Sequence, residues 1–234
     1  MNTNLSSKKQ IFFTSILFFI SIIIFIISLF VMKITSSFHW DGTIFDISKV
    51  NSLDRNLANP YNHFLHIVGT ITCGISYIFL PICFISYTVY KSQNKKWTFF
   101  VLILIFCTTC FFNKGFYDLL KALVERVRPY MYFENPAQKG ILSGDFQHSW
   151  PSGHTANAFM GISFITINLI FSKDKSIWKK IFILTGYIFS VATGICRILS
   201  GNHYFTDVLS GGFLGSFVGF GISFLNQKFG MKIS

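Results

Sequence analysis

The sequence predicts an all-α membrane protein, a bundle of six transmembrane helices with interfacial helices on its extracytoplasmic side. Hydrophobic residues make up 51% of the 234 residues and charged residues only 12%, whereas about a quarter of a soluble domain is charged. The hydrophobic residues also come in long blocks. Together these observations favour membrane spans over the core of a large soluble domain.

Six apolar segments are candidates for spans, since a helix needs roughly 17–25 residues to cross a bilayer. They lie in a single domain, 1–234, at residues 11–32, 64–90, 97–116, 155–171, 181–199 and 206–225. The first is longer than the roughly 7–15-residue core of a signal peptide, and no small-residue cleavage site follows it. We therefore expect an uncleaved helix there.

Lysine placement predicts the orientation of these spans. With a cytoplasmic N-terminus, the cytoplasmic segments are short and rich in lysine, as the positive-inside tendency requires. These segments are 1–10, 91–96, 172–180 and the tail from 226. Both termini are then cytoplasmic. The longer segments 33–63 and 117–153 lie on the other side, and 33–63 is expected to form short helices at the interface.

The formal net charge of +11 does not indicate nucleic-acid binding, because the lysines flank apolar segments and no soluble basic domain is present. Membrane topology and anionic lipid headgroups account for the charge. The five cysteines all fall within apolar stretches, so we expect neither disulfides nor a metal site.

Three short polar segments stand at the mouths of the predicted spans, and the topology brings all three to the extracytoplasmic side. They are residues 121–129 (KALVERVRP), 151–154 (PSGH) and 197–207 (RILSGNHYFTD). Together they supply the cations, histidines, carboxylate and glycine turn needed to bind a phosphate and attack it. Such a site beside lipid favours a lipid phosphate as substrate.

The first segment places Lys121 and Arg128 seven residues apart, on one face if it is helical. Fixed cations stabilise the negative charge that a phosphoryl group spreads over three oxygens in transfer. In the second segment, Ser152 is a good helix N-cap and Gly153 lets backbone N–H groups approach an anion. His154 follows with a pKa suited to proton transfer. Taken singly, these features also fit an interfacial cation pair and an ordinary helix cap.

In the third segment, His203 and Asp207 are four residues apart, so a helical turn would set the carboxylate against one ring nitrogen. The other nitrogen would then be free to act as a nucleophile. Arg197 ends a predicted span, where function or snorkelling would be needed to tolerate it. A buried structural His–Asp pair is the alternative for this segment.

In combination the three segments closely resemble the signature of the type 2 phosphatidic acid phosphatase (PAP2) superfamily, which also includes vanadium haloperoxidases. The shared pattern is lysine, six residues, Arg-Pro; then Pro-Ser-Gly-His; then arginine, five residues, histidine, three residues, aspartate. The resemblance covers the 24 residues of the three segments, and the six-span plan extends it over most of the chain. One departure is Cys196, where the family usually has serine before the arginine of the third motif.

The resemblance implies a helical bundle that hydrolyses phosphate esters without metal or other cofactor. It implies that His203 attacks phosphorus to form a phosphohistidine, that Asp207 orients His203, and that His154 protonates the leaving group and then activates water. The residues implied to hold the phosphate oxygens are Lys121, Arg128, Ser152, Gly153 and Arg197. The departure at Cys196 puts only a secondary phosphate contact in doubt.

The best candidate for the reaction is hydrolysis of a lipid A 1-phosphate group in the outer leaflet of a bacterial inner membrane. Alternative substrates are phosphatidylglycerophosphate, undecaprenyl diphosphate and phosphatidic acid. Lipid-to-lipid phosphotransfer would use the same motifs, and a non-catalytic protein that binds or transports anionic lipid is the alternative outside enzymes. Vanadate-dependent halide oxidation would share the pocket, but a diffusible substrate needs no membrane.

The remaining polar residues near the motifs carry weaker expectations. Solvated loop positions or headgroup contacts are expected for Glu125, Arg126, Lys139, Asp145 and His148. Lys114 and Asp118 have the i, i+4 spacing of an ion pair. No partner spacing is recognised for His39, His63 and His66, which we interpret as interfacial structure.

Overall fold

The computed structural model describes residues 3–36, 40, 42, 45–171 and 177–229, and within them the fold is all-helical, as predicted. The long helices are α1 (Thr3–Thr35), α3 (His63–Gly74), α4 (Leu80–Lys91), α5 (Lys95–Val124), α7 (Gly153–Ile170), α8 (Ile177–Leu199) and α9 (Phe205–Phe229). Short helices follow α1 and α5: α2 (Ser52–Asn56) and α6 (Gln138–Leu142), with 3₁₀ turns at Ile47–Lys49, Pro129–Tyr132 and Asp145–Gln147.

Helices α3 and α4 form one continuous rod, because a π-helical turn at Ile75–Phe79 joins them. Pro81 lies in the first turn of α4. A proline cannot donate a backbone hydrogen bond, and the wider π turn is a common way to accommodate such a break within a helix. The rod runs from His63 to Lys91 and is one of the predicted spans.

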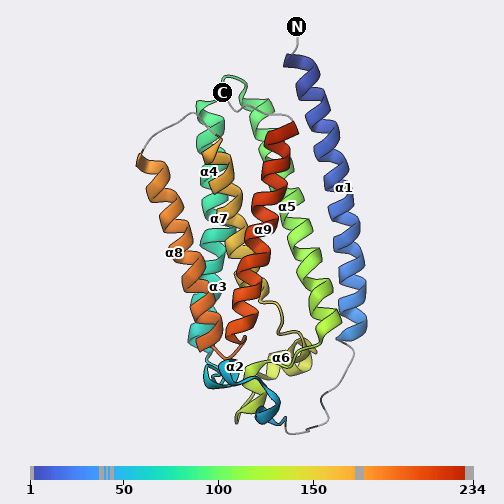
Figure 1. The fold of residues 1–234 in the computed structure, drawn as a ribbon, viewed down its shortest axis with the longest axis vertical. Coiled ribbons are helices and arrows are strands. Elements are labelled where there is room, and N and C mark those ends of the chain that lie inside the picture. The colour runs from blue at the N-terminus through green and yellow to red at the C-terminus, as the bar shows by residue number, and fades with distance from the viewer. Residues whose placement is uncertain (1–2, 37–39, 41, 43–44, 172–176, 230–234) are drawn as a thin grey trace.

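Five helical segments are long and apolar enough to cross a membrane among the described residues, so the chain is a multi-pass membrane protein. They are Ile11–Thr35, His63–Lys91, Lys95–Tyr132, Lys179–Leu199 and Phe205–Lys228. The predicted fourth span corresponds to α7, which is not one of the five, although it runs lengthwise in the bundle (Figure 1). Six spans therefore stay a prediction.

Helix α7 forms the centre of the bundle, and its side chains are buried on nearly every side. Its apolar residues pack against α4 and α5 through Phe84, Phe106 and Phe164, whose rings lie 5.2–5.9 Å apart. The polar side chains of Thr155 and Asn168 are buried inside protein rather than facing lipid. Polar residues within a membrane are tolerated where they face the interior of the bundle.

Glycines on one face of α9 bring it against α7. A Cβ built at Gly211, Gly215 or Gly219 would lie 2.0–2.6 Å from a backbone oxygen of residues 152, 156 and 160. Small residues spaced by four let helix backbones approach closely inside a membrane. This packing matters for the site, because it fixes the start of α9 against the start of α7.

Helix α1 lies at the edge of the bundle beside α5 (Figure 1). Phe25 and Phe111 bring their rings to 5.3 Å, and a Cβ at Gly115 would meet the backbone of Phe25 at 2.9 Å. The other sides of α1 present large apolar side chains outward, as expected of a lipid-facing helix.

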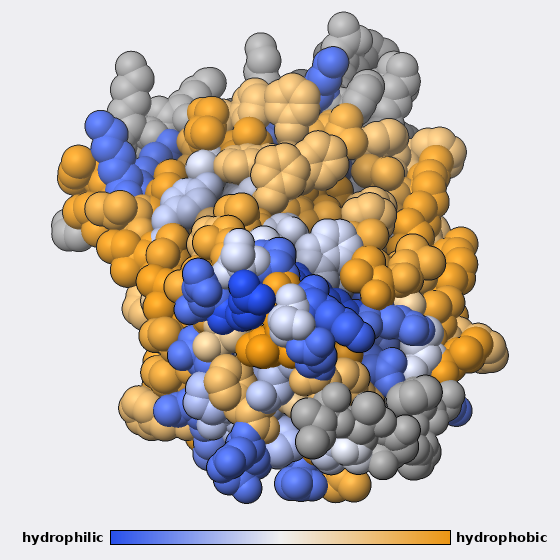
Figure 2. Space-filling model, turned by 60° about the horizontal axis from the view of Figure 1, so that its bottom comes forward, coloured by the Kyte–Doolittle hydropathy of each residue, from blue (hydrophilic) through white to orange (hydrophobic). Residues whose placement is uncertain are grey.

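The three polar segments lie at one end of the bundle, together with α2 and α6, whereas α1 begins and α9 ends at the other end (Figure 1). Seen toward the site end, hydrophilic side chains gather between hydrophobic flanks (Figure 2). The predicted lysine-rich segment 172–180 and the tail from 226 lie partly outside the described residues, as does His39.

Candidate functional site

Helix α5 is longer than the predicted third span and carries Lys121 in its last turn. The helix ends at Val124, because Glu125 adopts a left-handed conformation with a φ of 48°. The segment is therefore not helical as far as Arg128, and the condition under which Lys121 and Arg128 would share a helical face is not met. They approach the same site because the chain after Glu125 runs beside residues 146–149. The Arg128 N–H donates to the Phe146 carbonyl at 2.8 Å, and the Ser149 N–H donates to the Arg126 carbonyl at 2.9 Å.

Arg128 is buried and its guanidinium is fixed from several directions. Nη2 donates to the Asp145 carboxylate at 2.7 Å, and Nη1 donates to the Asn202 carbonyl at 2.9 Å. Nη1 also lies 3.2 Å from Nε2 of His203. Lys121 is buried close by and donates to the backbone carbonyl of His148.

The second segment begins α7 as predicted. Ser152 is the N-cap, and its hydroxyl accepts from the Thr155 N–H at 3.5 Å. The Ser152 N–H donates to the Asp207 carbonyl at 2.9 Å, which ties the second segment to the third. Gly153 has a packing role in addition to the predicted one, because a Cβ there would lie 2.9 Å from the ring of Tyr117.

The third segment joins α8 to α9 through a turn at Gly201, whose φ is +70°. A Cβ at that glycine would also collide with the carbonyl of Asn59, at 2.4 Å. The turn places His203 just before α9 and Asp207 in its first turn, both buried. Arg197 is 2% exposed and lies in the last turn of α8.

His203 lies between a carboxylate and a guanidinium. Its Nδ1 is 3.6 Å from Oδ2 of Asp207, and its Nε2 is 3.2 Å from Nη1 of Arg128. Because Arg128 can only donate, Nε2 must accept and Nδ1 carries the proton of the neutral ring. The predicted pairing of Asp207 with His203 is therefore a close contact, because 3.6 Å is too long for a hydrogen bond. Catalytic contacts of this kind often shorten only when substrate binds.

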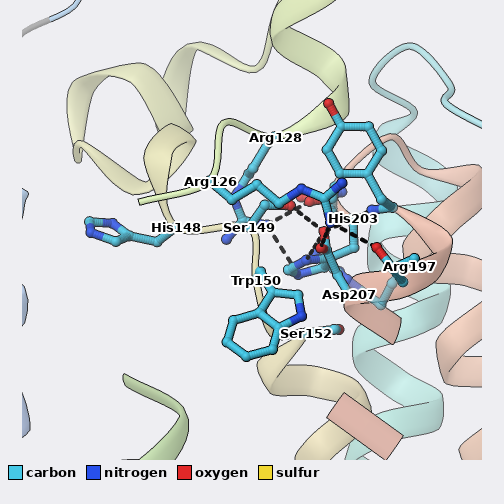
Figure 3. A network of polar contacts seen from close by, with 12 residues as sticks. Arg126, Arg128, His148, Ser149, Trp150, Ser152, Arg197, His203 and Asp207 are labelled. Atoms are coloured by element: carbon cyan, nitrogen blue, oxygen red, sulfur yellow. Dashed lines mark hydrogen bonds and ion pairs between the residues drawn. The ribbon is translucent and has the colours of Figure 1, made fainter. Parts of the chain in front are cut away.

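Asp207 is held by donors other than His203. Arg126 Nη1 donates to Oδ1 at 2.5 Å, while the Ser149 hydroxyl and the Tyr204 N–H both donate to Oδ2. Figure 3 shows Arg126, Arg128 and Ser149 gathered around His203 and Asp207, and the ring of His148 pointing away from them. The position of the carboxylate is thus fixed by donors from three separate parts of the chain.

The cations of the site lower the proton affinity of both histidines. The pKa of His203 lies well below its ordinary value, first because the ring is desolvated and then because Arg128, Lys121 and Arg197 surround it. Desolvation likewise holds the pKa of His154 well below its usual value, with Arg197 and Arg128 as the next causes. The same cations act on both rings, which places His154 and His203 beside one cationic centre.

Arg197 offers a buried donor to that centre. Its Nε has no hydrogen-bond partner among the residues that the structure describes, although Nη1 lies 3.2 Å from Nδ1 of His66. His66 also stacks edge-on against His154, with ring centroids 6.5 Å apart. His66 therefore belongs to the site rather than to interfacial structure alone. Cys196 faces α3 at Gly69.

Several residues expected to be solvated belong to the network instead. Arg126 and Asp145 form buried or half-buried ion pairs, with Asp207 and Arg128 respectively. Burial raises the pKa of Asp145, but the positive charge of Arg128 outweighs it together with smaller contributions, and the pKa falls to about 2. Glu125 and Lys139 are exposed as expected. His148 bonds the Thr35 hydroxyl at 3.0 Å.

One further contact follows the sequence pattern. Lys114 and Asp118 form the ion pair expected from their spacing along α5.

Asp54 is a site residue that sequence reasoning missed altogether. It lies in α2, is fully buried and bonds Arg126 at 2.7 Å. No local spacing links it to the three segments.

The structure thus brings together the eight residues predicted for the site. They are Lys121, Arg128, Ser152, Gly153, His154, Arg197, His203 and Asp207. Fold and site define an all-helical membrane protein with a cationic, histidine-containing site at one end of its bundle.

Comparison with known proteins identifies the family. Residues 98–230 match the PAP2 superfamily. Phosphatidylglycerophosphatase B of Bacillus subtilis (strain 168) is 32% identical over 165 residues, covering 68% of this chain and 73% of that protein. The chain belongs to the PAP2 superfamily and is an enzyme of that lipid phosphatase family, as the three segments predicted.

Other similar proteins match more weakly. Probable lipid phosphate phosphatase 4 of Arabidopsis thaliana is 26% identical over 163 residues, which cover 60% of this chain and 52% of that protein. Lipid A 1-phosphatase of Porphyromonas gingivalis is 37% identical over 76 residues, only 32% of this chain and 16% of that protein. The crystal structure of a transmembrane PAP2 type phosphatidylglycerolphosphate phosphatase from Bacillus subtilis aligns with a TM-score of 0.50 at 23% identity, over 89% of this chain and 96% of that one, and supports the fold.

Proposed function

We propose that the protein hydrolyses the phosphate monoester of a membrane lipid through a phosphohistidine at His203. The position of His203 carries this proposal. Its Nδ1 faces the Asp207 carboxylate at 3.6 Å, and its Nε2 lies 3.2 Å from a guanidinium nitrogen of Arg128. A ring nitrogen that can only accept, next to a fixed cation, suits attack on a phosphate whose oxygens that cation holds.

The reaction runs in two balanced steps. In the first, Nε2 of His203 forms a bond to phosphorus while the bond to the lipid oxygen breaks, and His154 gives its proton to that oxygen. In the second, His154 takes a proton from water, the water oxygen attacks phosphorus, and the N–P bond breaks to release inorganic phosphate. The donors proposed for the phosphoryl oxygens are Lys121, Arg128, Arg197, the Ser152 hydroxyl and the backbone N–H of Gly153.

Substrate binding prepares His154 for the first step. In the free site the lowered pKa leaves its ring neutral near pH 7. A bound phosphate places negative charge among Arg197, Arg128 and Lys121, which offsets their repulsion and raises the proton affinity of His154. His154 therefore becomes protonated, and able to act as the acid, when a phosphate is bound beside it.

Two apolar grooves along α9 provide space for lipid chains beside this site. One is lined by Leu120, Trp150, Pro151 and Leu209, which adjoin the motif residues along the chain. The other lies on the opposite side of Leu209, between α8 and α9, and includes Ile198 and Phe205. Exposed apolar side chains, among them Leu209 and Phe213, line both grooves, which favours a substrate that stays in the bilayer.

Phosphatidylglycerophosphate is the substrate we propose first. The phosphatidylglycerophosphatase B relative matches most of its own length and most of this chain, whereas the lipid A 1-phosphatase match covers about a third of this chain. Lipid A 1-phosphate, the best candidate from sequence alone, is the second candidate because of that shorter match. Headgroup choice falls to the segments 33–63 and 130–150, which lie outside the motifs.

The test measures free phosphate released by the purified protein from phosphatidylglycerophosphate, lipid A, undecaprenyl diphosphate and phosphatidate, with thin-layer detection of any phosphorylated lipid product. We expect phosphate release that EDTA leaves unchanged and vanadate inhibits. The His203→Gln variant should lose several orders of magnitude in kcat if a covalent intermediate forms. Transfer of the phosphate to a second lipid would identify a phosphotransferase, and undiminished phosphate release by His203→Gln would rule out the phosphohistidine mechanism.

A further inference from the structure

Asp54 is a fully buried carboxylate in the segment between α1 and α3, away from the three motifs in sequence. It accepts four hydrogen bonds. Arg126 Nη2 and Asn51 Nδ2 each donate at 2.7 Å, the Thr206 hydroxyl donates at 2.6 Å, and the Thr206 N–H donates at 3.0 Å. A buried carboxylate with this many donors remains charged, and the pKa of Asp54 is accordingly lowered by Thr206 and Arg126 against the cost of burial.

Arg126 connects Asp54 to the nucleophile. Its Nη2 donates to Asp54 and its Nη1 donates to Oδ1 of Asp207, so one guanidinium bridges two carboxylates. The remaining oxygen of Asp207 faces Nδ1 of His203. The face of Arg126 is covered by the ring of Tyr204, 4.2 Å from the guanidinium carbon, which shields the bridge from water.

We propose that Asp54 is a positioning residue that acts on His203 through Arg126 and Asp207. This inference rests on the proposed phosphohistidine function. Two carboxylates and one guanidinium leave one net negative charge in the bridge. Without Asp54, the guanidinium would neutralise Asp207 alone, and the field that favours a proton on Nδ1 and an electron-rich Nε2 of His203 would weaken.

Asp54 also fixes the geometry of the start of α9. By accepting from the N–H and the hydroxyl of Thr206, it caps the helix whose first turn carries Asp207. A carboxylate at a helix N-terminus is favoured by the backbone dipoles. The segment 45–62 is thus linked to the catalytic carboxylate, although it carries none of the family motif.

The experiment compares Asp54→Asn and Arg126→Gln by the pH dependence of kcat/KM, in which the acidic limb reports the proton affinity of the free nucleophile. Asp54→Asn removes negative charge, so the limb should move to lower pH and kcat should fall about 10- to 100-fold, the loss typical of removing a supporting partner behind a functional group. Arg126→Gln removes positive charge, so the limb should move to higher pH. A structural defect alone would not move the limb in opposite directions.

The groups that face His203 from the surrounding elements stay unchanged in both variants. They are Lys121 on α5, Arg128 and Asp145 on the segment after it, His154 on α7, Arg197 on α8 and Asp207 on α9. Asp46→Asn is the matched control, because Asp46 is an exposed carboxylate of the same segment that caps a 3₁₀ turn and does not contact Arg126. It should leave both kcat and the pH profile as in the wild type.

Thermal unfolding in detergent checks that each variant folds. If only one of the two variants folds, the direction in which its acidic limb moves still tests the inference. Unchanged pH profiles in folded variants, or shifts in the same direction, would overturn the inference while the activity of the wild type and the loss in His203→Gln still stood. Absence of phosphatase activity in the wild type would instead overturn the proposed function.

Discussion

At the scale of single residues, the proposed mechanism depends on two imidazoles that need opposite protonation states in one cationic pocket. His203 must be neutral to attack, and its desolvation and the surrounding cations lower its pKa. His154 must hold a proton to protonate the leaving group, although the same cations lower its pKa too. A bound anion resolves this conflict, because it raises the proton affinity of the ring that donates a proton to it, which is His154.

Anion binding should therefore be accompanied by the uptake of a proton at His154. Because the pKa of His154 is lower in the free protein than in the complex, affinity for an anion should fall as pH rises through the window between the two values. The slope is at most about tenfold per pH unit for one proton. Sulfate is the suitable probe, since its own charge does not change over this range, and calorimetry between pH 5.5 and 8 gives its dissociation constant.

The His154→Asn variant provides the control for that measurement. It should bind sulfate with a flatter pH dependence, while the cations Arg128 and Arg197 remain in place. If the variant kept the full slope of the wild type, the proton would be taken up elsewhere, with His203 and His66 as the remaining rings beside the anion.

Single residues also show how far sequence reasoning reaches. The eight predicted site residues could be named because fixed spacings within three short segments carry them. Asp54 and His66 could not, because each acts through a partner far along the chain, Arg126 and Arg197 respectively. The nearest signal was Arg126 itself, a third cation in the first motif whose own partners were not recognisable from local spacing.

At the scale of elements, the position of α9 decides whether Asp207 reaches the second segment. The Asp207 carbonyl accepts from the Ser152 N–H, and this bond stands beside the glycine face where α9 meets α7. Hydropathy predicted both helices. It could not predict this contact, which depends on glycines that lack a side chain. Hydropathy also missed the end of α5. The residue that ends the helix in a left-handed conformation is Glu125, whereas a glycine at that position would have been a recognisable stop signal.

Gly215→Ala should therefore lower both stability and activity. The added Cβ would lie 2.0 Å from the Ala156 carbonyl oxygen and 2.9 Å from its Cα, so the two backbones must separate. Overpacking of this kind costs about 1–3 kcal/mol. Thermal unfolding in detergent and the rate of phosphate release measure the two effects. Gly221→Ala is the matched control in the same helix, because a Cβ there meets nothing within 4 Å, and an equal loss in both variants would contradict the glycine-face argument.

At the scale of the whole molecule, the distribution of cations separates the two ends of the bundle. The exposed lysines Lys91, Lys95 and Lys96 lie in or beside the turn between α4 and α5, at the end where α1 begins and α9 ends (Figure 1). At the other end, Lys121, Arg128 and Arg197 are buried in the site, and the exposed Lys49, Arg55 and Lys139 are spread over the longer segments 33–63 and 117–153. The positive-inside tendency therefore favours a cytoplasmic location for the lysine-rich end.

This orientation would place the active site on the periplasmic face of a bacterial inner membrane, and it can be tested by labelling with a membrane-impermeant maleimide in intact Gram-negative cells. Lys139→Cys, on the exposed surface of α6 at the site end, should react in cells whose outer membrane alone is permeabilised, whereas Lys95→Cys should react only after the inner membrane is opened. The parent chain measures the background from its own five cysteines, which all lie in apolar stretches. Because a charged headgroup does not cross the bilayer unaided, the labelled face is also the leaflet from which substrate can be drawn. The reverse labelling pattern would move the site to the cytoplasmic leaflet and would rule out a substrate exposed only on the periplasmic side.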